Sequence, residues 1–197
     1  MYKIVITGGI ACGKSLYSDY LRDLGAEILD CDDIVHDLET PDGVAVLPIA
    51  EAFGREMIKG DGSIDRVKLG AAVFDDPEAL QKLNAIVHPL VDLYVENWFK
   101  QKHDGIPVVV IPLLFEIGWE NRYDCVIALI SDRKVQIQRL VELRNCGRKE
   151  AEARLGSQLP TSDKAARAHI VVYNNGSAEA LKSEAERVLS LLKMRYE

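Results

Sequence analysis

Hydrophobic runs that alternate with helical patterns organise this chain. Five short β-branched or apolar runs predict strands at residues 2–7, 26–29, 106–111, 125–130 and 170–173. After the first run and two glycines, apolar residues recur at helical spacing at Leu16, Tyr20, Leu21 and Leu24. Strands of this kind, separated by helices, are typical of a parallel sheet covered on both faces. The pattern therefore predicts an α/β fold with five parallel strands.

The stretch 41–104 contains no long β run and is predicted to be mostly helical. Residues 76–78 (Asp-Pro-Glu) have the order of an N-cap, a first-turn proline and a first-turn acid. His88 and Pro89 are predicted to form a turn that joins two helices, although His88 could also serve a site.

A glycine-rich motif joins the first strand to the first helix. Residues 8–15 (Gly-Gly-Ile-Ala-Cys-Gly-Lys-Ser) fit the pattern G-x-x-x-x-G-K-S in the strand–loop–helix context that phosphate binding requires. The glycines let backbone N–H groups turn toward a phosphate, and the helix N-terminus adds positive potential. Lys14 is suited to neutralise phosphate oxygens and Ser15 to bind magnesium. The alternative, a glycine-rich turn with an exposed lysine, is disfavoured by this context, so we predict nucleoside triphosphate binding.

Carboxylates follow the second predicted strand, at the sheet edge where doubly wound folds bind ligands. Asp32 could accept a proton from a substrate hydroxyl or hold magnesium, whereas the alternative is that Asp30, Asp32 and Asp33 only cap the next helix. Spacing leaves both interpretations open. His36 lies one helical turn after Asp32 and could face the same cleft.

The segment after the third strand, residues 112–116 (Pro-Leu-Leu-Phe-Glu), offers an apolar wall and one carboxylate. Ile111 stands where many proteins with this loop carry a magnesium-binding aspartate. Magnesium would then rely on Ser15, nucleotide oxygens, water and either Asp32 or Glu116, because this ion keeps few protein ligands. Alternatively, Glu116 only solvates a loop.

Residues 133–154 carry seven basic side chains against three acidic ones. Helices that bring Arg139 and Arg144 over a transferred phosphate would supply positive charge and exclude water, as a lid does. The alternative is a solvated helical face. His103 and His169 belong to no constellation.

Composition narrows the classes of protein. The 197 residues include 24 basic and 31 acidic side chains, so the net charge of −7 disfavours passive binding to nucleic acid or to an anionic membrane. The longest apolar run, residues 106–115, is too short to span a membrane, which takes about 20 residues. Residues 1–6 enter a strand without a leader pattern, and the cysteines lack metal spacing. We expect one cytoplasmic domain with free thiols.

Taken together, these motifs resemble the dephospho-coenzyme A kinase family over residues 4–176. The segments that carry the resemblance are Thr7–Ile10 leading into Gly13–Ser15, Asp30–Asp32 with His36, His88-Pro89, Pro112–Glu116, Gln138-Arg139 with Arg144, Gln158, and Asn174–Gly176. The resemblance implies transfer of the γ-phosphoryl group of ATP, with Mg²⁺, to the ribose 3′-hydroxyl of dephospho-coenzyme A. The product would be coenzyme A.

The resemblance also implies roles for individual residues. Catalytic roles fall to Lys14, Asp32, Arg139 and Arg144, and metal binding to Ser15 and Asp32. Nucleotide binding falls to Gly9, Ile10, Ala11, Cys12, Gly13, Lys14, Ser15, Leu16, Asn175 and Gly176, with the last two near the adenine. Substrate binding falls to Thr7, Asp32, His36, His88, Leu113, Leu114, Phe115 and Glu116.

The implied architecture is a single kinase domain, residues 1–197, with the three-layer α/β/α fold of P-loop NTPases. Its sub-regions are a nucleotide-binding core (1–40, 105–132 and 168–197), a helical substrate-binding insertion (41–104) and a helical lid (133–158). The implied partner is the small molecule dephospho-coenzyme A, without nucleic acid or membrane. We expect a monomer or a weak homo-oligomer.

Several positions depart from the family pattern, and other functions stay open. Ala11-Cys12 replaces the common Gly-Ser, and Leu16, Ile111 and His169 replace threonine and two aspartates. Cys12 at a helix N-terminus could be sensitive to oxidation, or it could be a quiet structural thiol. The alternatives are another small P-loop kinase acting on a nucleoside or nucleotide, a nucleotide-dependent switch protein, and an inactive member of the fold.

Overall fold

The computed structural model describes residues 2–144 and 146–196, without the side chains of Arg144 and Tyr196. It divides into two compact units. The first unit comprises the described residues of 1–29 and 102–197, and the second comprises residues 30–101.

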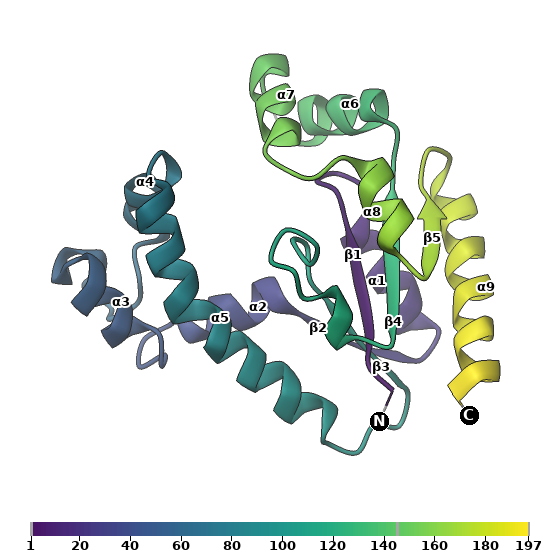
Figure 1. Ribbon diagram of the computed structural model, residues 1–197, viewed down its shortest axis with the longest axis horizontal. Coiled ribbons are helices and arrows are strands. Elements are labelled where there is room, and N and C mark those ends of the chain that lie inside the picture. Colours follow the sequence, from purple (N-terminus) through teal and green to yellow (C-terminus); the bar gives the residue numbers. More distant parts are fainter. Residues whose placement is uncertain (1, 145, 197) are drawn as a thin grey trace. The chain divides into compact units, whose positions relative to one another are not determined.

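A five-stranded sheet with the order β2-β3-β1-β4-β5 forms the centre of the first unit (Figure 1). The strands are β1 (Ile4–Gly8), β2 (Ala26–Asp30), β3 (Ile106–Val110), β4 (Cys125–Ile130) and β5 (Ile170–Tyr173). β1 pairs in parallel with β3 and β4, and β4 pairs in parallel with β5. The predicted fold class is therefore confirmed. β1 lies at the middle of the sheet and is buried throughout, so the loop after it starts from a fixed position.

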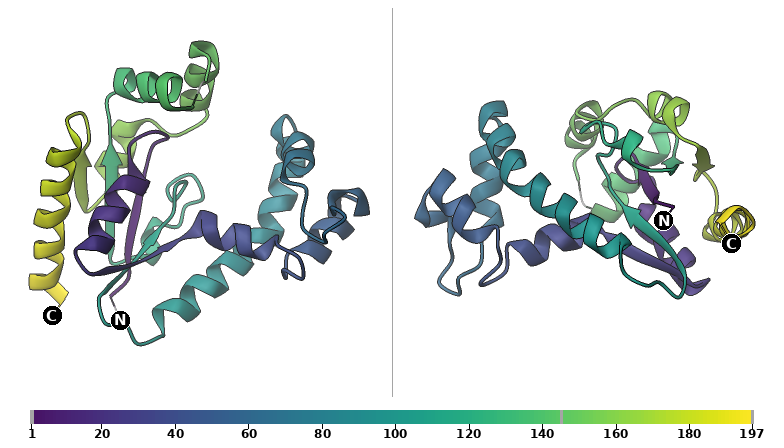
Figure 2. Two further views of the ribbon diagram at one scale, coloured as in Figure 1. Left: turned by 180° about the vertical axis from the view of Figure 1, so that it is seen from behind. Right: turned by 60° about the horizontal axis from the view of Figure 1, so that its bottom comes forward.

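Helices cover both faces of this sheet. The helices of this unit are α1 (Lys14–Asp23), α6 (Arg133–Arg144), α7 (Arg148–Gly156), α8 (Thr161–Arg167) and α9 (Ala178–Tyr196), with a 3₁₀ turn, η2 (Glu120–Arg122). Of these, α6 and α7 lie beyond the ends of the strands (Figure 1). α1 and α9 pack on each other at one face, and α8 contacts β4 from the other side (Figures 1 and 2). This arrangement is the three-layer α/β/α order that was predicted.

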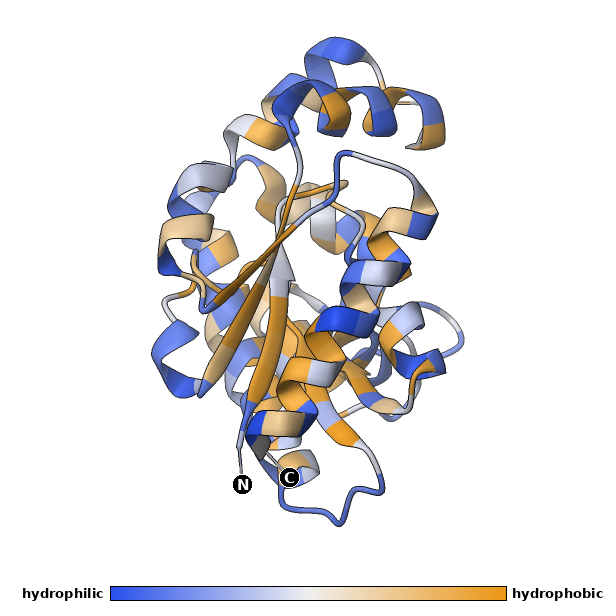
Figure 3. Ribbon diagram, turned by 90° about the vertical axis from the view of Figure 1, so that its right-hand side faces the viewer, coloured by the Kyte–Doolittle hydropathy of each residue, from blue (hydrophilic) through white to orange (hydrophobic). Residues whose placement is uncertain are grey.

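The strands are the most hydrophobic part of the unit (Figure 3). Alternate residues of β1, Ile4 and Ile6, join Tyr17 and Leu21 of α1 in a fully buried cluster. The predicted place of Leu16 on the core face is wrong, because Leu16 is 41% exposed and Tyr17 fills that position. The helix begins at Lys14, and Tyr17 and Leu21 lie one turn apart on its inner face.

The second unit is helical, which confirms the prediction for residues 41–104. It contains α2 (Cys31–Leu38), α3 (Val46–Phe53), the 3₁₀ turn η1 (Arg55–Met57), α4 (Arg66–Phe74) and α5 (Pro77–Phe99). α5 packs against α2, α3 and α4 and thereby holds this unit together. Among the helices of the described residues, none has the length and apolarity needed to cross a membrane.

The predicted turn at His88 and Pro89 is wrong, because α5 runs uninterrupted through both residues. Proline in a helix interior removes one hydrogen bond and crowds the preceding turn. Val87, Val91 and Val95 repeat every four residues on the buried face of α5. Their burial outweighs the local penalty of the proline.

The four cysteines, Cys12, Cys31, Cys125 and Cys146, are buried free thiols, as the sequence predicted. Burial raises the pKa of Cys125 to about 11. Burial, together with the neighbouring carboxylates of Asp30 and Asp32, also raises the pKa of Cys31. These two thiols therefore stay protonated at neutral pH.

The side chain of Asp76 accepts hydrogen bonds from the backbone N–H groups of Glu78 (2.9 Å) and Ala79 (3.0 Å) and so caps α5. We predict that Asp76→Ala lowers the free energy of unfolding by about 1 kcal/mol, the usual value of such a cap. Urea denaturation measures the free energy of unfolding of Asp76→Ala, with the neighbouring Asp75→Ala as the control. Equal stability of the two variants would show that the cap contributes nothing.

Candidate active site

The loop between β1 and α1 has the backbone geometry of an anion-binding turn. Gly13 has φ of 89° and Ala11 has φ of 58°, both in the left-handed region. At Gly13 a side chain would also overlap the amide nitrogen of Asn174, so only glycine fits. Gly8 and Gly9 are buried, while Ile10 and Ala11 form the partly buried tip of the loop.

Lys14 lies at the start of α1, and its ammonium group reaches back over the loop. Nζ donates to the carbonyl oxygens of Gly8 (2.9 Å) and Gly9 (3.0 Å). Ser15 and Leu16 follow in the first turn of α1, and both are exposed. The structure therefore places the cation and the hydroxyl at the same end of one helix, beside the loop.

Asn174, the residue after β5, holds the loop from the same carboxyl end of the parallel sheet. Its Nδ2 donates to the carbonyl oxygen of Cys12 (3.0 Å), and its Oδ1 accepts from Arg139 (3.3 Å). Its backbone carbonyl accepts from the hydroxyl of Ser131 (2.7 Å). Asn174 is buried, and the sequence analysis missed its role although the Asn-Asn-Gly segment was the available signal.

Arg139 of α6 belongs to the same cluster. Its guanidinium donates to the carbonyl oxygen of Ala11 (3.2 Å) and to the hydroxyl of Ser131 (3.2 Å), in addition to Asn174. A planar guanidinium can make several such bonds at once. Arg139 therefore lies against the backbone of the phosphate loop, and its role at a transferred phosphate stays a prediction.

The other arginines of residues 133–154 do not all contact the phosphate loop. Arg148 pairs with Glu152 (3.3 Å), and Arg154 pairs with Glu150 (2.7 Å), each one turn away on α7. These exposed pairs match the alternative of a solvated helical face. Arg144 ends α6, and its side chain lies outside the described part of the chain.

Asn175 and Gly176 are exposed beside the site. The side-chain oxygen of Asn175 accepts a hydrogen bond from the backbone N–H of Asp132 (2.8 Å). This bond joins the segment after β5 to the segment after β4. The adenine contact of Asn175 and Gly176 stays a prediction.

Cys12 is completely buried, and its sulfur lies 3.3 Å from Nε2 of Gln136. Because solvent and oxidants do not reach a buried thiol directly, this placement favours the quiet structural reading of Cys12.

The segment after β3 presents less apolar surface than the sequence predicted. Leu114 and Phe115 are buried in the protein core, whereas Leu113 is 44% exposed. Thr7 is buried as well, and its hydroxyl donates to the carbonyl oxygen of Pro112 (3.2 Å). Of these four predicted substrate-binding residues, Leu113 alone offers a large exposed surface.

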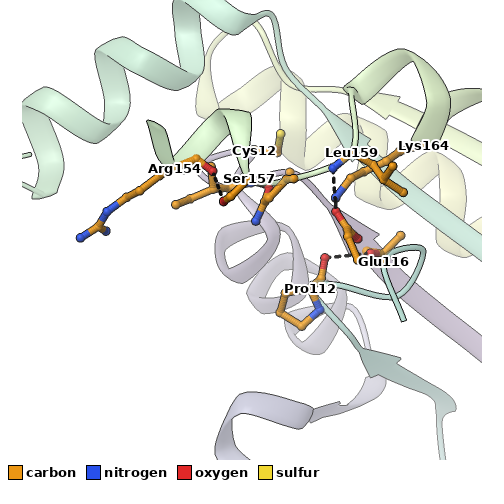
Figure 4. A network of polar contacts seen from close by, with 12 residues as sticks. Cys12, Pro112, Glu116, Arg154, Ser157, Leu159 and Lys164 are labelled. Atoms are coloured by element: carbon orange, nitrogen blue, oxygen red, sulfur yellow. Dashed lines mark hydrogen bonds and ion pairs between the residues drawn. The ribbon is translucent and has the colours of Figure 1, made fainter. Parts of the chain in front are cut away.

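Glu116 makes a buried ion pair with Lys164 of α8 (2.6 Å), a lysine with no exposed surface (Figure 4). The same oxygen accepts a hydrogen bond from the backbone N–H of Leu159 (3.1 Å). The alternative that Glu116 merely solvates a loop is therefore wrong. The carboxylate ties the segment after β3 to the segment that follows α7.

In the second unit, Asp30 caps α2 by accepting from the backbone N–H of Asp32 (2.9 Å). The capping interpretation therefore holds for Asp30, while Asp32 has an exposed carboxylate in the first turn. A groove of about 430 Å³ adjoins it, lined by Asp32, Val35, Glu39, Arg66, Leu69, Gly70, Val73 and Leu83. Glu39 and Arg66 form an ion pair (2.6 Å) at this groove.

The two predicted histidines lie on different helices of this unit. His36 is exposed on α2, and His88 is half-buried on α5. Burial lowers the pKa of His88, which keeps its ring neutral at physiological pH.

Among the described residues, no group of three or more His, Cys, Asp or Glu side chains could hold a metal ion. The exposed hydroxyl of Ser15 beside the phosphate loop is an oxygen donor of the kind that Mg²⁺ accepts. The donors present therefore fit an ion that takes most of its ligands from a bound nucleotide and from water.

Comparisons with known proteins agree with this geometry. The family model for dephospho-CoA kinase matches residues 2–180. The chain is 42% identical over 196 residues to a dephospho-CoA kinase of Anaeromyxobacter dehalogenans, and the alignment covers 98% of this chain and 93% of that protein. It is 39% identical over 188 residues to the enzyme of Geobacter sulfurreducens, with coverage of 94% and 95%.

Solved structures give the same result. The crystal structure of TT1252 from Thermus thermophilus has a TM-score of 0.83 at 32% identity, with 98% of this chain and 99% of that chain covered. Dephospho-CoA kinase from Campylobacter jejuni has a TM-score of 0.74 at 26% identity, with coverage of 99% and 98%. A shikimate kinase from Acinetobacter baumannii, with a TM-score of 0.55 at 18% identity, shares the fold alone.

The sheet order, the phosphate loop and these structural neighbours define an α/β kinase of the P-loop class. Within that class, the chain belongs to the dephospho-CoA kinase family.

The buried pair of Lys164 and Glu116 gives a stability prediction. We expect Lys164→Met to lower the free energy of unfolding by about 3 kcal/mol, because Glu116 is then left buried without its counter-charge. Adding Glu116→Gln should recover part of this loss, since the unpaired charge is removed. Urea denaturation of both single variants and the double variant tests this, and strictly additive losses would contradict an interaction between the two side chains.

Proposed function

We propose that this protein transfers the γ-phosphoryl group of ATP to the ribose 3′-hydroxyl of dephospho-coenzyme A, giving coenzyme A and ADP. Membership of the family supports the reaction. The observation that carries it is the phosphate loop, whose glycine geometry is combined with Lys14 and Arg139 against its backbone. Such an arrangement stabilises negative charge with groups that are already in place.

In the proposed reaction, the 3′-oxygen attacks the γ-phosphorus while the bond from that phosphorus to the bridging oxygen of ADP breaks. Asp32 accepts the proton of the hydroxyl. Its exposed carboxylate, which has no capping role, supports this assignment. Lys14, Arg139 and, as the resemblance implies, Arg144 balance the charge on the transferred group.

We further propose Mg²⁺ as the metal, held by Ser15 and Asp32 together with nucleotide oxygens and water. When bound, it neutralises charge on the phosphates. The Ser15 hydroxyl and the Asp32 carboxylate are exposed oxygen donors, and both are of the type that Mg²⁺ prefers.

The remaining assignments are proposals of the same kind. Residues 41–104 form the substrate-binding region, with His36 and His88 contributing, and residues 133–158 act as the lid. The groove beside Asp32 combines apolar side chains with the ion pair of Glu39 and Arg66, which suits a substrate with apolar and charged parts. We propose a cytoplasmic monomer or weak homo-oligomer.

An acceptor panel tests the function. Purified protein with ATP and Mg²⁺ is given dephospho-coenzyme A, AMP, GMP, a nucleoside or no acceptor, and ADP release and product mass are measured. We expect ADP release only with dephospho-coenzyme A, with a product of coenzyme A mass. Turnover with another acceptor alone would keep the kinase class and reject the substrate, and acceptor-independent hydrolysis would favour a switch protein.

Asp32→Asn tests the proposed base. We predict that kcat falls about a hundredfold or more while the Kd for ATP measured without Mg²⁺ is unchanged, because the amide cannot take the proton but adds no steric change. Asp33→Asn is the matched control, since Asp33 is an exposed neighbour in the same helical turn. Equal kcat values for the two variants would reject Asp32 as the base.

A further inference from the structure

The helix pair α6–α7 has a small apolar core of its own. Leu140, Cys146, Ala151 and Leu155 are buried together, and Ile10 and Ala11 of the phosphate loop pack against them with Ile137. The tip of the loop thus completes the core of the helix pair. Nonpolar packing therefore already links the phosphate loop to the helix pair.

Two glutamines hold the backbone of Ile10 from opposite ends of this helix pair. Nε2 of Gln136, in the first turn of α6, donates to the carbonyl oxygen of Ile10 (2.7 Å). Oε1 of Gln158, two residues after the end of α7, accepts from the N–H of Ile10 (2.9 Å). Both hydrogen-bonding groups of Ile10 are therefore satisfied by side chains near the two ends of the proposed lid, residues 133–158.

The site is closely packed around these bonds. Gln136 is 2% exposed, and a side chain at Gly9 would lie within 2.7 Å of its Nε2. The neighbouring Ala11 has φ of 58°, a backbone conformation that a residue with a side chain adopts only when its surroundings hold it there. Arg139 holds that residue through its carbonyl oxygen.

We propose that Gln136 and Gln158 are positioning residues that join the tip of the phosphate loop to α6–α7, so that the loop and the helix pair move as one body. The lid then cannot leave the loop without breaking both bonds to Ile10. Nucleotide binding at the loop would in turn restrain α7. The inference rests on the proposed nucleotide binding at this loop and is independent of the acceptor.

The test compares Gln136→Met and Gln158→Met with Gln138→Met. Methionine keeps the length of the side chain and removes the amide. Gln138 is the matched control, because it is exposed on the same helix and its amide bonds Glu142 (3.0 Å). Far-UV circular dichroism establishes folding, and the partly exposed Gln158 carries the test if the buried variant fails to fold.

Two measurements are made on each variant without any acceptor. The first is the Kd for ATP, which we expect to rise about threefold to tenfold in both loop variants, as for loss of one hydrogen bond. The second is backbone amide exchange by NMR, with and without ATP. We expect faster exchange at Ile10 in Gln158→Met, and ATP should protect α7 amides in the wild type but far less in either loop variant.

Gln158→Glu adds a conservative rescue, because a carboxylate still accepts from the N–H of Ile10. Its Ile10 exchange without nucleotide should match the wild type. The proposal is overturned if both methionine variants match Gln138→Met, or if ATP affinity falls while exchange at Ile10 and in α7 is unchanged. None of these readouts needs phosphoryl transfer. A negative result in the acceptor panel would therefore not affect the outcome of this test.

Discussion

The side-chain amide of Asn174 is the contact on which the site depends most directly. It joins the carbonyl oxygen of Cys12 to the guanidinium of Arg139, while its backbone oxygen holds Ser131. These groups come from the residues that follow β4 and β5, the middle of α6 and the phosphate loop. A buried amide of this kind must satisfy both its donor and its acceptor, so it specifies one arrangement of all four segments.

Similar buried polar contacts surround the loop. Glu116 and Lys164 connect the segment after β3 with α8, and Gln158 connects the end of α7 with the loop itself. A complete contact of this kind adds little net stability, whereas removing one of its two partners strongly destabilises the fold. The effect of these contacts is to fix geometry. The phosphate-binding groups are therefore positioned before a nucleotide binds, which lowers the entropic penalty of ordering them later.

Local signals in the sequence were sufficient to predict the strands, the glycine loop and the N-cap at Asp76. These features depend on residues only a few positions apart, and the structure has them where the patterns indicated. The predictions for Leu16 and for a turn at Pro89 failed for the opposite reason. In both cases tertiary packing, by Tyr17 and by the valines of α5, decided against the local pattern.

The partners of the loop could not be read from a single sequence. Asn174 and Gln136 lie 162 and 124 residues from Cys12, and only the place of β1 between β3 and β4 brings such segments together. Polar residues such as Gln136 and Lys164 are usually exposed, so nothing local marks them as buried. The roles of Asp32, His36 and His88 rest on the resemblance and on their place in the second unit.

The most direct measurement is the Kd for ATP of Asn174→Leu compared with the wild type, with far-UV circular dichroism to establish that the sheet is intact. Leucine keeps the volume of the side chain but leaves the carbonyl of Cys12 and the guanidinium of Arg139 without this partner. The account predicts that ATP binding weakens about tenfold or more. An unchanged Kd in a folded variant would contradict the claim that buried polar contacts, rather than the glycine loop alone, hold the phosphate site in place.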